Sequence, residues 1–178
     1  MDVQITLEKT QLECSEGMTH LLVHIDHSSA VPNKMMIRLG LPNGINALKN
    51  LNQFSEDADH NVTLIDRHED VDLVFELFTE EDLPIGSLLL MVTLSCMFNG
   101  KQYKRTMQVP LAIVPEERSE QIPVNAEIAS YVAKIKNNQR QHEEQIRYVV
   151  LPPLQARDYT RSPLEKKHCI QGFTEAFR

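Results

Sequence analysis

A short run of metal-binding residue types, His24-Ile25-Asp26-His27, is the first place in this chain where side chains could do chemistry. A zinc site needs about four converging ligands, and a site of the H-x-H-x-D-H type would need a histidine where Leu22 stands. Alternation along a strand would also send His24 and His27 to opposite faces. We therefore expect His24 and Asp26 to face outward near a strand end, with zinc as the alternative.

A group of carboxylates forms the second candidate site. Calcium takes about six to eight oxygen ligands, which loops at one end of a sandwich can supply. Solvated acidic loops account for the same residues without a metal, and the EF-hand spacing D-x-D-x-D-G is absent. Calcium is therefore an alternative and no metal-ligating residue is assigned. The group consists of Glu56, Asp57, Asp59, Asp66, Glu69, Asp70 and Asp72.

No motif indicates an enzyme. The chain has no G-x-S-x-G sequence, and the neighbours His168 and Cys169 would point about 100° apart on a helix. The run from Gly40 to Gly44 lacks the lysine of a phosphate-binding loop. We expect no catalytic residue, no cofactor and no cofactor-binding residue.

The cysteines and the hydropathy suggest a compartment. Cys14, Cys96 and Cys169 are too widely spaced for a metal knuckle or a disulfide framework, and Cys96 alternates with apolar residues as a core residue would. The N-terminus lacks the features of a signal peptide, and the longest apolar run, residues 88–92, is too short to span a bilayer. These features predict a cytoplasmic location without membrane insertion.

The elements that must position these residues change character at Val114-Pro115. Before this point, short runs of apolar residues recur with period two, which is typical of strands. The pattern predicts a mainly β fold, an immunoglobulin-like antiparallel β-sandwich of about seven strands over residues 1–115. The runs lie at residues 3–7, 19–27, 35–41, 62–65, 71–78, 90–98 and 103–113.

Several turn residues sharpen this prediction. Pro42-Asn43-Gly44 predicts a turn, and Asn99-Gly100 predicts a two-residue hairpin. Pro110 lies inside the last run, and proline in a strand is confined to sheet edges and bulges. Residues 48–60 have no clear period and are expected to form a long loop.

Residues 116–178 are predicted to form a helical C-terminal arm, with helices at about residues 125–149 and 163–176. Asn125 is a suitable N-cap, and Ser162-Pro163-Leu164-Glu165 has the form of a capping box. The apolar face of the arm could pack on its own sandwich, pair with a copy of itself or dock on another protein. For the last case we predict four partner-binding residues: Ile128, Val132, Ile135 and Phe173.

Charge is divided unevenly along the chain. Of the net charge of −7, residues 1–114 carry 16 acidic and 8 basic side chains, and the remainder carries 9 acidic and 10 basic ones. An acidic sandwich repels phosphate backbones, so nucleic-acid binding is not expected. It could attract a basic partner or the basic face of its own arm.

Two proline-containing turns and the start of the arm carry a resemblance. They are Leu41-Pro42-Asn43-Gly44-Ile45, Leu83-Pro84-Ile85-Gly86-Ser87 and the segment Pro123-Val124-Asn125-Ala126-Glu127-Ile128. The first two resemble turns of bacterial Ig-like accessory modules, and the third is similar to the helical tail after the sandwich in von Willebrand factor A-domain proteins. The adhesion domain of that family is absent, since no D-x-S-x-S sequence occurs. The resemblance implies an assembly role and transfers no functional residue.

Together these features predict a non-enzymatic protein–protein interaction, scaffold or adaptor module that organises a complex through its sandwich edge or its helical arm. One alternative is a metal-dependent calcium- or zinc-binding protein. The other is a structural subunit of a larger assembly, in which the strand containing Pro110 pairs with a neighbour. The expected partner is another protein, and the sequence leaves a homo-oligomer open.

Overall fold

A computed structural model gives the fold of residues 2–26, 32, 34–67, 69–80, 82–98 and 100–145, without the side chains of residues 142–145. The chain divides into two units, Met1–Gln145 and Ile146–Arg178. All described residues belong to the first unit. The predicted helix at residues 163–176 and the last residues of the predicted helix at 125–149 lie outside the described part.

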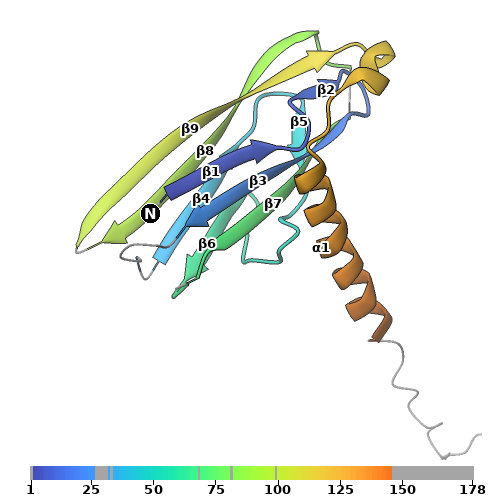
Figure 1. Ribbon diagram of the computed structural model, residues 1–178. Helices are drawn as coiled ribbons and strands as arrows, with labels where there is room; N and C mark the ends of the chain where they lie inside the picture. Colours follow the sequence, from blue (N-terminus) through green and yellow to red (C-terminus); the bar gives the residue numbers. More distant parts are fainter. Residues whose placement is uncertain are drawn as a thin grey trace, which may run out of the picture. The chain divides into compact units, whose positions relative to one another are not determined.

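Two stacked sheets form the first unit, and they confirm the predicted mainly β, immunoglobulin-like sandwich (Figure 1). Sheet A has the order β1-β3-β7-β5, with β1 (Asp2–Leu7), β3 (Met18–Asp26), β7 (Val71–Thr79) and β5 (Ile45–Ala47). Sheet B has the order β2-β9-β8-β4-β6, with β2 (Gln11–Glu13), β9 (Lys101–Val114), β8 (Gly86–Phe98), β4 (Lys34–Gly40) and β6 (Asn61–Ile65).

Two strands exceed the predicted number. β2 and β5 contain three residues each, too few for a period of two to be recognised. β2 also departs from the predicted antiparallel pattern, because it pairs in parallel with the end of β9, from Ala112 to Val114. All other strand pairs are antiparallel.

The core fills the space between the two sheets, and the alternating residues of each strand supply it. Leu21, Val23 and Ile25 of β3 are fully buried, and so are Leu73 and Phe75 of β7. From sheet B the buried side chains include Ile37 of β4, Leu90 of β8 and Leu111 of β9. Burying one such side chain contributes about 1.5–3 kcal/mol to the free energy of folding. A shift of one residue would expose all the buried side chains of a strand, so this energy determines which face of each long strand points into the core. Cys96 is a buried core residue, as predicted.

The predicted turns are also confirmed. Gly44 has φ of 84°, and the N–H of Ile45 donates to the carbonyl of Pro42 over 3.2 Å. In the β8–β9 hairpin Phe98 pairs with Lys101, which leaves a two-residue loop, and Gly100 has φ of 72°. Positive φ costs glycine little, which explains its place in both turns.

Within the described residues, one α-helix, α1 (Ala126–Gln145), follows β9. Between them lies a 3₁₀ helix, η1 (Glu116–Gln121), that the sequence pattern did not predict. Asn125 is the N-cap, since its Oδ1 accepts hydrogen bonds from the N–H of Glu127 and of Ile128 over 3.1 and 3.4 Å. The apolar side of α1 packs on the outer face of sheet A, against Val74 of β7 and Leu22 of β3. Figure 1 shows α1 beside these two strands.

Candidate protein interface

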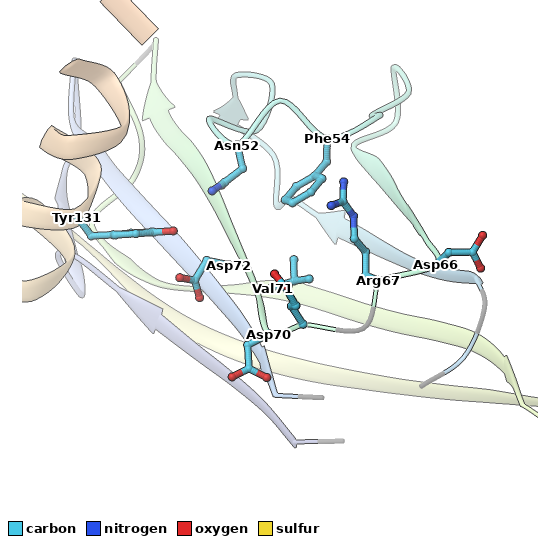
Figure 2. A pocket seen from close by; sticks show the side chains of 9 residues that line it. Asn52, Phe54, Asp66, Arg67, Asp70, Val71, Asp72 and Tyr131 are labelled. Atoms are coloured by element: carbon cyan, nitrogen blue, oxygen red, sulfur yellow. The ribbon is translucent and has the colours of Figure 1, made fainter. Parts of the chain in front are cut away.

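An acidic pocket of about 490 Å³ lies beside β7. Figure 2 shows Tyr131 of α1 at one end and Phe54 with Arg67 at the other. The Arg67 guanidinium lies 5.1 Å from the centre of the Phe54 ring. Asp72 lies between these ends, and its Oδ1 is 2.7 Å from Nδ1 of His24. This hydrogen bond raises the pKa of His24 above its usual value.

The carboxylates of the predicted calcium group are divided among separate hydrogen-bond networks. Glu56 accepts the N–H of Asn50 over 2.6 Å and contacts His60 Nδ1 over 2.7 Å. Asp57 instead accepts the backbone N–H of Asn61 over 2.9 Å. Among the described residues, no three or more His, Cys, Asp or Glu side chains form a group that could hold a metal ion.

The zinc alternative is not favoured either. His24 faces outward near the end of β3, as predicted, and its ring nitrogen bonds to Asp72. Asp26 lies on the same strand, at its last residue. His27, the third candidate ligand, lies outside the described residues.

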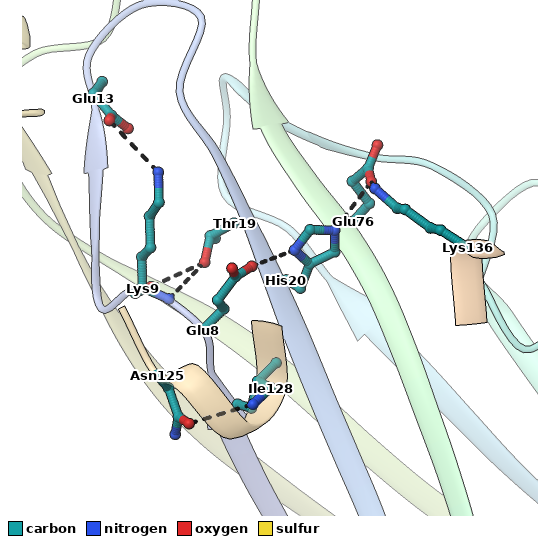
Figure 3. Close-up of polar contacts among 9 residues, drawn as sticks. All are labelled: Glu8, Lys9, Glu13, Thr19, His20, Glu76, Asn125, Ile128 and Lys136. Atoms are coloured by element: carbon teal, nitrogen blue, oxygen red, sulfur yellow. Dashed lines mark hydrogen bonds and ion pairs between the residues drawn. The ribbon is translucent and has the colours of Figure 1, made fainter. Parts of the chain in front are cut away.

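A buried histidine that the sequence pattern did not single out lies at the centre of a polar cluster beneath α1 (Figure 3). His20 of β3 contacts Glu8 through Nδ1 and Glu76 of β7 through Nε2, the latter over 3.1 Å. Lys136 of α1 donates a hydrogen bond to the same Glu76 oxygen. Burial alone would raise the pKa of Glu76, but the hydrogen bonds from Lys136 and His20 outweigh it and lower that pKa. The bond between Lys136 and Glu76 therefore holds α1 against sheet A.

The structure places three of the four predicted partner-binding residues on the face of α1 that packs on sheet A. Ile128 and Val132 are buried there, and Ile135 is partly buried beside them. Phe173 lies outside the described residues. That these four residues bind a partner stays a prediction.

An open strand edge is the clearest binding feature of the sandwich. β9 pairs with β8 from Lys101 to Ile113, whereas β2 covers its other side only from Ala112 to Val114. Among the described residues, no strand pairs with residues 101–111 on that side. An unpaired edge of this length offers a row of free N–H and C=O groups to another strand.

The direction of these groups follows from the pairing with β2. The N–H of Ala112 donates to the carbonyl of Thr10, and the carbonyl of Val114 accepts from Cys14, so both residues point away from β8. Because direction alternates along an antiparallel strand, Gln102, Lys104, Thr106 and Gln108 also point outward. Pro110 shares this direction, so its missing N–H breaks no bond to β8. The prediction that Pro110 marks a sheet edge is confirmed.

A groove between the two sheets lies beside this open edge. It has a volume of about 210 Å³, and its lining joins Val3 of β1 with Leu94 and Cys96 of β8. Tyr103, Lys104 and Arg105 of β9 complete it. Burial raises the pKa of the Cys96 thiol, which disfavours the reactive thiolate. The groove therefore offers an apolar floor and a cationic rim, without an activated nucleophile.

Comparisons with known proteins return structures rather than families. No family model matches the chain, and no curated protein matches it. A variant of BcpA, the major pilin subunit of Bacillus cereus, is 13% identical with a TM-score of 0.43, over 63% of this chain and 40% of the pilin. MyfA, the major subunit of Myf fimbriae from Yersinia enterocolitica, is 11% identical with a TM-score of 0.41, over 62% of this chain and 98% of the self-complemented MyfA chain.

A third similar structure is AggA, the major subunit of aggregative adherence fimbriae type I from Escherichia coli. It is 11% identical with a TM-score of 0.33, over 64% of this chain and 95% of AggA. These three structures give no support to the resemblance to von Willebrand factor A-domain proteins.

One prediction is corrected by these comparisons. The similar chains are described as subunits of pili and fimbriae, which contradicts the cytoplasmic location predicted from the apolar pattern and the cysteines. That location is withdrawn. Within the described residues, no helix has both the length and the apolar character needed to cross a membrane.

Proposed function

We propose that this chain is a non-enzymatic structural subunit of a protein assembly, and that a neighbouring protein joins it by adding a strand to the open edge of β9. The observation that carries the proposal is the unpaired stretch of β9 from residue 101 to residue 111, beside a groove that reaches the core. Strand addition of this kind gives affinity through backbone hydrogen bonds and specificity through alternate side chains.

The edge is better suited to a partner than the arm is. The apolar face of α1 is occupied, since Ile128 and Val132 already lie against Val74 of sheet A. By contrast, Tyr103 on the inner side of β9 is 51% exposed, and Met107 is only partly buried. An added strand would cover both side chains and satisfy the outward backbone groups at once.

One substitution on β9 removes an edge donor and leaves the β8–β9 ladder intact. Thr106→Pro deletes an outward N–H, and Pro110 shows that a proline ring is tolerated at an outward position four residues further along the strand. Thr106→Val is the matched control. Like Thr106→Pro, it loses the Thr106 hydroxyl that lies 3.0 Å from Thr93 Oγ1, but it keeps the backbone N–H.

Affinity purification from the native cells with the intact chain and both variants tests the proposal. We expect the intact chain and Thr106→Val to retain the same stoichiometric protein, and Thr106→Pro to retain at least about tenfold less. Thermal unfolding of each variant checks that the sandwich remains folded. Equal retention by Thr106→Pro, or no stoichiometric protein on any bait, would contradict the proposal.

A further inference from the structure

Charge is separated between the two layers of the sandwich. The strands of sheet A carry Asp2, Asp26, Asp72 and Glu76, and they contain no Lys or Arg. The strands of sheet B carry one carboxylate, Glu13 of β2, and five cations. These cations are Lys34, Arg38, Lys101, Lys104 and Arg105.

Three of the five cations lie on the open edge of β9. Lys101, Lys104 and Arg105 are all exposed, and the last two line the groove. Between Asp82 and Glu116 the sequence contains no carboxylate, although the whole chain carries a net charge of −7. The edge therefore has a positive charge that its own hairpin does not neutralise.

From this arrangement we infer that the strand received by β9 is an acidic segment of another protein, with apolar residues facing the groove and carboxylates at the intervening positions. The inference rests on the proposed function and names the class of its partner. Inward side chains of the added strand would cover Val3, Leu94 and Tyr103. Its carboxylates would meet Lys104 on the outer face, while Arg105 and Lys101, which lie on the inner side of β9 with Tyr103, add to the positive charge of the edge.

The same cations repel a second copy of β9 that approaches the open edge. A second copy of β9 would place another cluster of Lys101, Lys104 and Arg105 close to the first, with no carboxylate on either strand between them. Specificity of this kind combines attraction for one partner with repulsion of another. The charge of the edge accordingly favours an acidic strand over a second copy of β9.

The length of the receiving edge limits the partner segment. Residues 102–108 offer four outward-facing residues with both N–H and C=O, and seven residues of strand span about 23 Å. A nine-residue peptide in which Val alternates with Glu is therefore a suitable probe. The comparison peptide has Lys in place of every Glu and keeps the same apolar face.

We expect the Glu peptide to bind the full chain at least about tenfold more tightly than the Lys peptide, with an affinity that falls as salt is raised. Thr106→Pro should weaken the binding of the Glu peptide, whereas Thr106→Val should leave that binding unchanged. The double variant Lys104→Glu, Arg105→Glu should prefer the Lys peptide. Its matched control, Lys34→Glu with Arg38→Glu, makes the same charge change on β4 and should keep the original preference.

The two experiments distinguish a failure of the acidic partner from a failure of strand addition to β9. Equal binding of the two peptides, or no binding of either, overturns the acidic partner, while the edge still stands if Thr106→Pro loses the protein retained from cells. A dimer of the intact chain that Thr106→Pro abolishes also overturns the inference, because it shows a second copy on β9. If Thr106→Pro changes nothing in either experiment, both the inference and the proposed function fail.

Discussion

Asp72 links two elements through its side chain, because it bonds to His24 of β3 and to Tyr131 of α1. Its hydrogen bond raises the folded-state pKa of His24 above 6.5. The pair therefore adds stability that is complete below the unfolded pKa and is lost as pH rises through the raised folded value. Both side chains are about one-third exposed, so solvent screening keeps this contribution small.

Substitution of Asp72 tests this origin of the shift. Asp72→Asn should lower the pKa of His24, because the charged acceptor is removed, and an NMR titration of the ring would measure it. Asp70→Asn is the matched control, since Asp70 acts on His24 through charge alone and more weakly. An unchanged His24 pKa in Asp72→Asn would show that the hydrogen bond is not the cause.

The two turn glycines with positive φ allow a second test at this scale. A Cβ on Gly44 would lie 2.1 Å from Leu83 Cδ2, whereas a Cβ on Gly100 would meet no atom within 4 Å. We expect Gly44→Ala to lower the free energy of unfolding by about 1–3 kcal/mol and Gly100→Ala by about 1 kcal/mol. Chemical denaturation measures both. Equal losses would mean that backbone strain, and not crowding by Leu83, decides the cost.

Among the elements, α1 depends on a small contact area with sheet A. Ile128 is 3% exposed and packs with Val132 on Val74, while Lys136 and Gln139 bond to Glu76 and to the carbonyl of Leu51. Ile128→Ala should cost about 2–4 kcal/mol of helix docking, because it leaves a cavity at the centre of this contact.

Hydrogen exchange would locate this loss. We expect faster exchange of the α1 amides in Ile128→Ala, with β3 and β8 unchanged, because local opening needs less free energy than global unfolding. Lys134→Ala, at an exposed position of the same helix, serves as the control. A uniform loss of protection over the whole sandwich would instead make α1 part of a single cooperative unit.

The sequence predicts the elements that repeat their pattern and misses those that do not. Seven strands, two turns, the N-cap Asn125 and the edge position of Pro110 follow from local rules of alternation and turn chemistry. β2 and β5 are too short to have a period. The sequence does not predict that His20 is buried, because its partners Glu8 and Glu76, and Lys136 that bonds to Glu76, come from three distant segments.

The sequence predicts the candidate interface only in outline. Pro110 predicts an edge strand, but the length of its open part depends on how far β2 reaches along β9, which no local pattern determines. Likewise, the linear charge count shows an acidic N-terminal part, whereas the division into an acidic sheet A and a basic sheet B appears only when the strands are ordered.

For the molecule as a whole, one edge of sheet B has no full-length strand partner among the described residues. β1 is the edge strand of sheet A, and β9 forms the edge of sheet B over residues 101–111, where β2 does not cover it. The groove at Val3 and Tyr103 lies between these two edges. A strand that completes sheet B would also bury the apolar floor of this groove. The central claim is that a partner strand occupies this place.

Hydrogen exchange at single-residue resolution tests that claim most directly, in the free chain and in complex with the protein retained by affinity purification. In the free chain, the odd-numbered amides of residues 102–108 should exchange slowly, because they face β8, and the even-numbered ones quickly. In the complex, we expect Gln102, Lys104, Thr106 and Gln108 to gain protection. Protection gained elsewhere, with these four amides still exchanging quickly, would contradict the account.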